Sequence, residues 1–151
     1  MTICLQEREG YKGFTLVELL LVIAIIAIVA AASGPSLTRL IGSSNLEVAG
    51  DKVVSSIRKS QSYAMDGKDN AVWGICINSG DLRLFKGSCS SPIYTEDYDL
   101  SGVSIVGLTE TTFSGSSGLR GEPSNALTIT VSNDIGTTII TLNAAGGIDI
   151  N

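Results

Sequence analysis

Residues 13–32 read GFTLVELLLVIAIIAIVAAA, and this stretch decides how the rest of the chain is organised. Within residues 14–32 only Thr15 and Glu18 are not apolar. A helix of about twenty apolar residues is long enough to cross the hydrocarbon core of a bilayer. The sequence therefore predicts that residues 14–34 form a transmembrane helix.

Glu18 is the unusual residue of this run. A carboxylate at the centre of a membrane helix costs about 2.5–3.5 kcal/mol on insertion scales, and less near a helix end. Such a charge is tolerated mainly where it is paired, so we expect a partner for Glu18. The alternative is an ordinary signal peptide or signal anchor, with Glu18 reaching the membrane interface. The apolar core of a signal peptide is shorter, at about 7–15 residues.

The residues around Gly13 resemble the type IV prepilin signature, in which a short polar leader ends in Gly and is followed by Phe-Thr-Leu-x-Glu and an apolar helix. The resemblance implies that a prepilin peptidase removes the leader, residues 1–13, and that Phe14 is then N-methylated. It also implies that Glu18 pairs with the N-terminal ammonium of a neighbouring subunit. The implied partners are other pilin or pseudopilin subunits, the peptidase and an inner-membrane assembly platform.

The helix is predicted to continue beyond the apolar run. Pro35 removes a helical hydrogen bond, and the resemblance implies a kink there or a stretch that melts on assembly. A plain kink with no role in assembly remains open. In residues 35–66 apolar side chains recur mostly at three- and four-residue steps, which predicts an amphipathic helix that packs on a sheet. Residues 66–70, DGKDN, are predicted to end it.

Residues 67–151 are predicted to form a β-rich globular domain, because turn residues separate short β-prone runs. The fold class is therefore α+β, with a long N-terminal helix packed on an antiparallel β domain. The C-terminal pattern looks like the H-type pseudopilins and FimT-like minor pilins, for which the same fold is expected. Residues 87–99 are predicted to be a loop, and strands are predicted over 71–78, 82–86, 103–106, 109–113, 126–132, 137–143 and 148–150.

Three cysteines are present, of which Cys4 lies in the leader. Cys76 and Cys89 remain in a domain that should face outward, where conditions are oxidising. We therefore predict a disulfide between them. The alternative is a pair of buried free thiols.

The composition argues against an enzyme and against a nucleic-acid-binding protein. The chain has no His, so it lacks the commonest general base and the commonest zinc ligand, and neither a catalytic site nor a cofactor is expected. Its net charge is −5, and residues 126–151 contain no Lys or Arg. Affinity for phosphates comes from Lys and Arg, so binding of nucleic acid is not expected.

Two groups of charged residues are candidate sites. Glu96, Asp97 and Asp99 carry oxygen ligands of the kind that calcium prefers, but their spacing does not specify a calcium site, and a solvated acidic loop is the simpler interpretation. The basic residues Lys52, Arg58, Lys59 and Lys68 are predicted to form a solvated face paired with Glu47, Asp51 and Asp66. Trp73 is predicted to belong to the core.

The sequence thus predicts a structural minor subunit that is held in the inner membrane by its apolar helix and then packs into a filament, with its β domain facing outward. The prepilin signature is shared by type IV pili and type II secretion, so both assemblies remain open. A DNA-binding minor pilin for DNA uptake is the alternative function.

Overall fold

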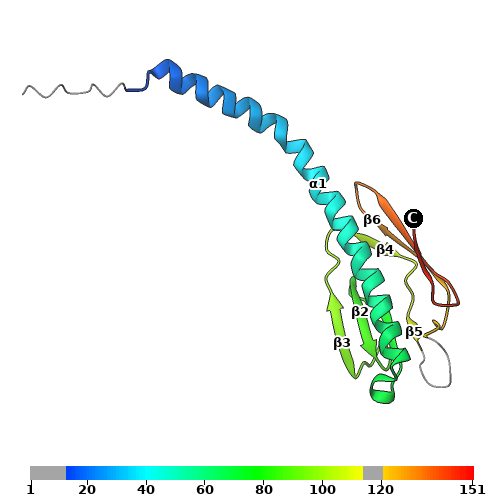
Figure 1. Cartoon of the computed structure of the whole chain (residues 1–151). Coiled ribbons are helices and arrows are strands. Elements are labelled where there is room, and N and C mark those ends of the chain that lie inside the picture. Colours follow the sequence, from blue (N-terminus) through cyan, green and yellow to red (C-terminus); the bar gives the residue numbers. More distant parts are fainter. Residues whose placement is uncertain (1–12, 114–120) are drawn as a thin grey trace, which may run out of the picture. The chain divides into compact units, whose positions relative to one another are not determined.

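The computed structural model describes residues 13–113 and 121–151, without the side chains of residues 32–36. The chain divides into two compact units, Met1–Thr38 and Arg39–Asn151. The helix α1, Leu16–Met65, begins in the first unit and ends in the second (Figure 1).

In the second unit α1 has one buried face. Its buried side chains recur at three- and four-residue steps, as the sequence predicts: Ala49, Val53, Val54, Ser56, Ile57, Ser60 and Ala64. The helix stays regular through Gly42 and Gly50. It ends at Met65, where Gly67 takes a left-handed conformation with φ of 60° and leads into the short 3-10 helix η1, Lys68–Asn70.

The first sheet follows η1 and has the strand order β3-β2-β1-β5, with every neighbouring pair antiparallel. Ser79 and Gly80 both have positive φ between β1 and β2, which is the geometry of a two-residue turn that matches the twist of a hairpin. The strands of this sheet are β1 (Trp73–Asn78), β2 (Asp81–Lys86), β3 (Tyr94–Tyr98) and β5 (Thr111–Phe113).

Strand β3 corrects the predicted loop over residues 87–99. Tyr94–Tyr98 pairs with β2 along its whole length and forms an edge of the sheet. The sequence did not indicate this strand, because acidic residues are depleted in strands and it contains two adjacent ones, Glu96 and Asp97. An edge strand tolerates them, since one side of its backbone is not covered by another strand.

The second sheet has the order β4-β6-β7-β8 and is also antiparallel. Side chains of β6 alternate between the core and the surface, as predicted from its period of two. The turn between β6 and β7 is held by Asn133, whose Oδ1 accepts hydrogen bonds from the backbone N–H groups of Ile135 and Gly136. The strands are β4 (Ser104–Val106), β6 (Leu127–Ser132), β7 (Thr137–Leu142) and β8 (Ile148–Ile150).

One hydrophobic core joins the second half of α1 to both sheets. Trp73 lies in it as predicted, with 1% of its surface exposed, and its indole N–H donates to the carbonyl of Lys68. The ring of Tyr63 on α1 meets that of Trp73 edge-on at 4.7 Å between centroids. The predicted α+β fold, a long helix packed on an antiparallel β domain, is therefore confirmed.

Candidate functional site

The segment before α1 contains the residues that the sequence singles out for processing. Gly13 and Phe14 lie outside any helix or strand. Phe14 is 86% exposed, and a Cβ built on Gly13 would meet no atom within 4 Å. Among the described residues, therefore, nothing covers the peptide bond that joins them.

Glu18 takes part in the N-terminal cap of α1. The backbone N–H and the hydroxyl of Thr15 each donate to Glu18 Oε2 at 3.3 Å, and the Glu18 N–H donates to Thr15 Oγ1 at 3.2 Å. This reciprocal pattern is a capping box, which satisfies backbone donors that the first helical turn leaves free. The sequence carries the signal for this cap as Thr-x-x-Glu before an apolar run, in addition to the intersubunit partner that the resemblance implies for Glu18.

The first unit presents apolar side chains on all sides of its helix. From Leu16 to Val29 the large apolar residues are each at least 45% exposed, with Leu16 at 77%. A surface of this kind is unusual for a protein that works alone in water and marks a contact with other apolar groups. Glu18, within its cap, is the only acidic residue in the first turn of α1.

The transmembrane span predicted over residues 14–34 is not supported by the structure. Within the part of the chain that the structure describes, none of the helices has the length and apolar character needed to cross a membrane. The kink or melting predicted at Pro35 concerns one of the residues whose side chains lie outside the described set.

Cys76 and Cys89 form the predicted disulfide, with their Cα atoms 6.3 Å apart. Cys76 is buried on β1, and Cys89 lies in the segment between β2 and β3. The bond thus fastens the segment that precedes edge strand β3 to the centre of the first sheet. Cys89 is further held by its backbone N–H, which donates to Glu110 Oε1 at 3.0 Å.

The carboxylates of Glu96, Asp97 and Asp99, in and just after β3, do not share a common partner. Asp97 forms a bidentate pair with Arg83 at 2.7 and 2.8 Å, and Asp99 accepts from the N–H and hydroxyl of Ser101. Glu96 turns instead toward α1. Among the described residues there is no group of three or more acidic, Cys or His side chains that could hold a metal ion.

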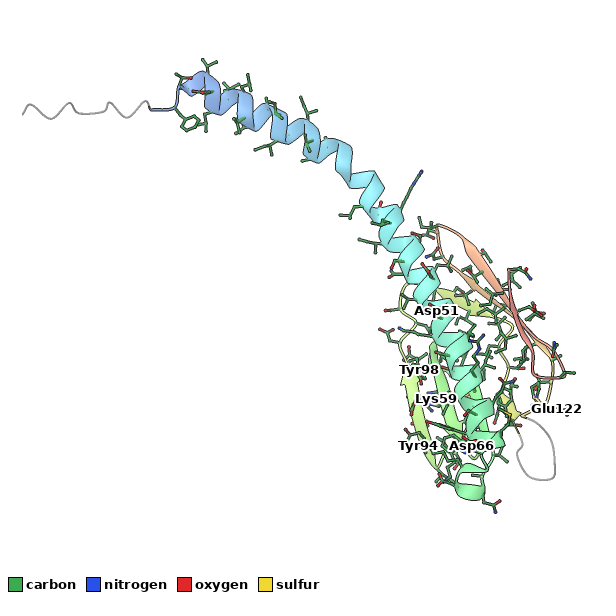
Figure 2. All side chains as sticks on the ribbon, in the orientation of Figure 1. Asp51, Lys59, Asp66, Tyr94, Tyr98 and Glu122 are labelled. Carbon is green, nitrogen blue, oxygen red and sulfur yellow. A yellow bond between two sulfur atoms is a disulfide. The ribbon has the colours of Figure 1, made fainter. Side chains whose placement is uncertain are left out.

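Among the described residues, Glu96 is the carboxylate that accepts the most side-chain hydrogen bonds. Lys59 lies on α1, and Tyr94 and Tyr98 lie on β3 (Figure 2). Lys59 and the hydroxyl of Tyr98 donate to Glu96 Oε2, and the hydroxyl of Tyr94 donates to Glu96 Oε1 at 2.7 Å. The hydrogen bond from Lys59, with those from the two tyrosines, lowers the pKa of Glu96 to about 2. The same bond raises the pKa of Lys59 above its ordinary value.

The predicted pairing of the basic helix residues with Glu47, Asp51 and Asp66 is wrong. Lys52 donates to the carbonyl of Asp99, Lys59 binds Glu96, and the ammonium of Lys68 lies 3.6 Å from the centre of the Tyr63 ring. The partners come from the segment 94–99 and from an aromatic ring, because tertiary packing brings them closer than the acidic residues of the helix itself.

Residues 10–34 match the family model described as the prokaryotic N-terminal methylation motif. Comparison of the chain with curated proteins finds no match, and comparison with solved structures finds none either. The matched segment ends shortly before the second unit begins at Arg39. It contains Gly13, Phe14 and Glu18, and it supports a type IV pilin-like protein.

Proposed function

We propose that this chain is a structural minor subunit, a pilin or pseudopilin, of a type IV pilus or a type II secretion pseudopilus. The observation that carries the proposal is the methylation motif at residues 10–34, with Glu18 set in a helix whose apolar side chains are exposed. Such a helix gains stability by packing against the same segment of other subunits. The C-terminal sequence pattern supports a place among the H-type pseudopilins and FimT-like minor pilins.

In this proposal the precursor is anchored at the inner membrane through its N-terminal segment. A prepilin peptidase cleaves after Gly13, and the new N-terminus at Phe14 is methylated. The exposure of both residues supports access of the peptidase to the bond. The chain is then a substrate of that enzyme and not an enzyme itself, and it needs no cofactor. It enters the filament through an inner-membrane platform, with its globular domain outward.

Glu18 has two roles in the proposal. Within one chain it caps α1 through Thr15. After cleavage the ammonium of Phe14 lies one residue before Thr15, whose backbone N–H and hydroxyl cap α1 with Glu18. In a staggered stack of helices the ammonium of the next subunit can reach the same carboxylate. That pair fixes the axial register where no water competes with it.

Processing is tested on protein extracted from membranes. Intact mass and N-terminal sequencing should show a mature chain that begins at Phe14. Gly13→Leu should leave the uncleaved precursor, because a large side chain replaces the small residue at the cleavage point. A mature N-terminus elsewhere would overturn the prepilin assignment.

The assembly role of Glu18 is tested by separating its charge from its capping function. Glu18→Gln keeps a side chain that can complete the capping box, whereas Glu18→Val loses both the cap and the charge. We expect both variants to be cleaved, and both to be nearly absent from sheared fibres relative to the membrane fraction. A Glu18→Gln variant that assembles at the wild-type level would show that the charge is not an assembly contact.

The DNA-binding alternative finds no favourable observation, since residues 126–151 carry no Lys or Arg. The pilus and the secretion pseudopilus are distinguished by deleting the gene and measuring both twitching motility and export of secreted proteins.

A further inference from the structure

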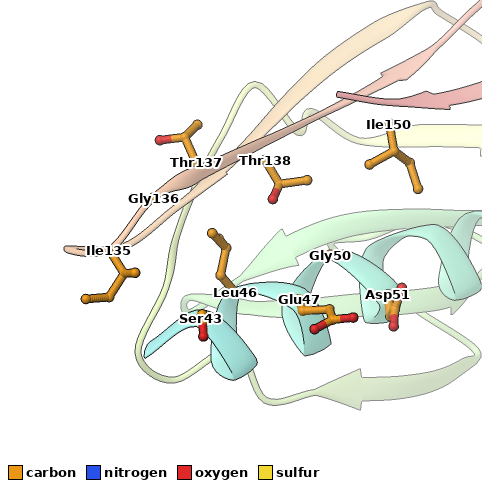
Figure 3. Close-up of a pocket in the computed structure, with 10 residues that line it drawn as sticks. All are labelled: Ser43, Leu46, Glu47, Gly50, Asp51, Ile135, Gly136, Thr137, Thr138 and Ile150. Carbon is orange, nitrogen blue, oxygen red and sulfur yellow. The ribbon is translucent and has the colours of Figure 1, made fainter. Parts of the chain in front are cut away.

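A groove of about 370 Å³ lies in the second unit between α1 and the strands β7 and β8. Its apolar walls include Leu46 from the helix, Ile135 from the β6–β7 turn and Ile150 from β8 (Figure 3). Ile135 and Ile150 are 47% and 55% exposed. The groove therefore leaves apolar surface in contact with water although it stands beside the packed core.

Two carboxylates belong to the same groove. Glu47 and Asp51 stand on successive turns of α1 and line it together with Gly50 (Figure 3). Both residues are exposed, and neither takes part in an ion pair among the residues that the structure describes. Apolar walls with two unpaired negative charges suit a partner that carries apolar side chains and one cation.

One segment of this chain has that chemistry. Arg39, Leu40 and Ile41 are consecutive on α1, and all three are exposed, Leu40 at 66% and Ile41 at 52%. The guanidinium of Arg39 also forms no ion pair in the described part of the chain. An Arg stem covers apolar surface while its charged end reaches a carboxylate, so the segment complements both the walls and the charges of the groove.

The segment cannot reach Glu47 and Asp51 of its own chain. Both lie on one uninterrupted helix, in which Arg39 is about 12 Å from Glu47 and about 18 Å from Asp51 along the axis. The occupant must therefore come from another molecule.

We propose that the groove binds the segment Arg39–Ile41 of a second copy of this chain, with Arg39 paired to Glu47 and Asp51. This inference rests on the proposed function, because it supplies a contact between globular units of neighbouring subunits in the filament. The donor segment and the groove are different surfaces, so the contact is heterologous and repeats in one direction. The two helices are then offset by about 12–18 Å along their axes.

The test exchanges the charges in the full-length chain and measures the ratio of sheared-fibre to membrane-bound protein. Arg39→Glu should lower this ratio about fivefold, because it places a third negative charge in the groove. The double variant Glu47→Arg with Asp51→Arg should lower it to a similar extent. Combining all three substitutions should restore most of the wild-type ratio. Arg58→Glu changes another exposed cation of α1, outside the groove, and serves as the matched control with no expected loss.

A cross-link identifies the occupant. One tagged copy carries Arg39→Cys and a differently tagged copy carries Asp51→Cys, and the native disulfide is checked by mass mapping in each. A disulfide between the two tags is expected in the mixture and not with Asp66→Cys, an exposed carboxylate in the turn that follows the helix. Equal cross-linking to Asp66→Cys, or failure of the triple variant to recover, would overturn the inference. If the wild type forms no fibre, the proposed function fails instead.

Discussion

Lys59 on α1 donates a hydrogen bond to Glu96 on edge strand β3, across 37 residues of sequence. The hydroxyls of Tyr94 and Tyr98 donate to the same carboxylate at 2.7 and 2.8 Å, so Glu96 accepts three hydrogen bonds. Its side chain is 26% exposed, and that of Lys59 is 35% exposed. Main-chain pairing holds edge strand β3 on one side only, through β2. The contact between Lys59 and Glu96 therefore adds an attachment of β3 to α1.

Glu96→Gln should therefore destabilise the second unit by about 1–2 kcal/mol, because Lys59 and two hydroxyls lose a charged acceptor. Chemical denaturation of the detergent-solubilised full chain measures this change. Asp97→Asn is the matched control, because it removes the neighbouring carboxylate, which is paired with Arg83 and is more exposed than Glu96, at 44%. Its effect should be within about 1 kcal/mol. Equal losses in the two variants would contradict the special role of Glu96.

The same carboxylate predicts a pH dependence. The folded-state pKa of Glu96 is lowered from 4.5 to about 2, so its stabilising contribution is present above pH 4.5. It is lost as the pH falls from 4.5 through about 2. Thermal midpoints of the wild type and Glu96→Gln should differ by a constant amount from pH 5 to 8 and converge progressively as the pH falls from 4.5 to about 2. Parallel profiles throughout would show that Glu96 does not titrate in this way. The raised pKa of Lys59 works in the opposite direction, as its contribution is lost only at alkaline pH.

The disulfide should contribute about 3 kcal/mol, as the chain-entropy model gives for a closed loop of this size. Replacing both cysteines with Ala avoids placing a polar atom at the buried position of Cys76. The denaturation midpoint of this double variant should match that of the reduced wild type. Mass mapping without reductant should recover the two cysteines in one peptide pair. Alkylation of Cys76 in the native protein would contradict the bond.

Gly42 and Gly50 should respond to Ala with opposite signs. A Cβ on Gly42 would lie within 2.4 Å of Ile135 Cγ1. Gly42→Ala should therefore destabilise the protein by about 1–2 kcal/mol, although Ala has a better helix propensity than Gly. A Cβ on Gly50 would meet only Thr138 Cγ2 at 3.9 Å, so Gly50→Ala should stabilise by up to about 1 kcal/mol. Adding Ile135→Ala should rescue Gly42→Ala. A stabilising Gly42→Ala would contradict the close approach of the turn.

Elements whose signals are local could be predicted from the amino-acid sequence. The period of apolar residues in 35–66 predicted the buried face of α1, and alternation predicted β6 and β7. Oxidising conditions predicted the bond between Cys76 and Cys89. The motif around Gly13 was readable because its residues are adjacent in the chain. The cap formed by Thr15 and Glu18 is equally local and could have been predicted from Thr-x-x-Glu.

Contacts between residues that are distant in sequence became apparent only in the folded chain. Glu96 belongs to an edge strand and binds Lys59, although its charge and acidic neighbour indicated a solvated loop. Gly42, which in sequence only weakens a helix, makes room for Ile135, and its carbonyl accepts a hydrogen bond from Asn133 Nδ2 at 2.7 Å. The physical reason is that helix and strand signals repeat within a few residues. The partner of a charge and the space beside a glycine depend instead on which surfaces the packed core brings together.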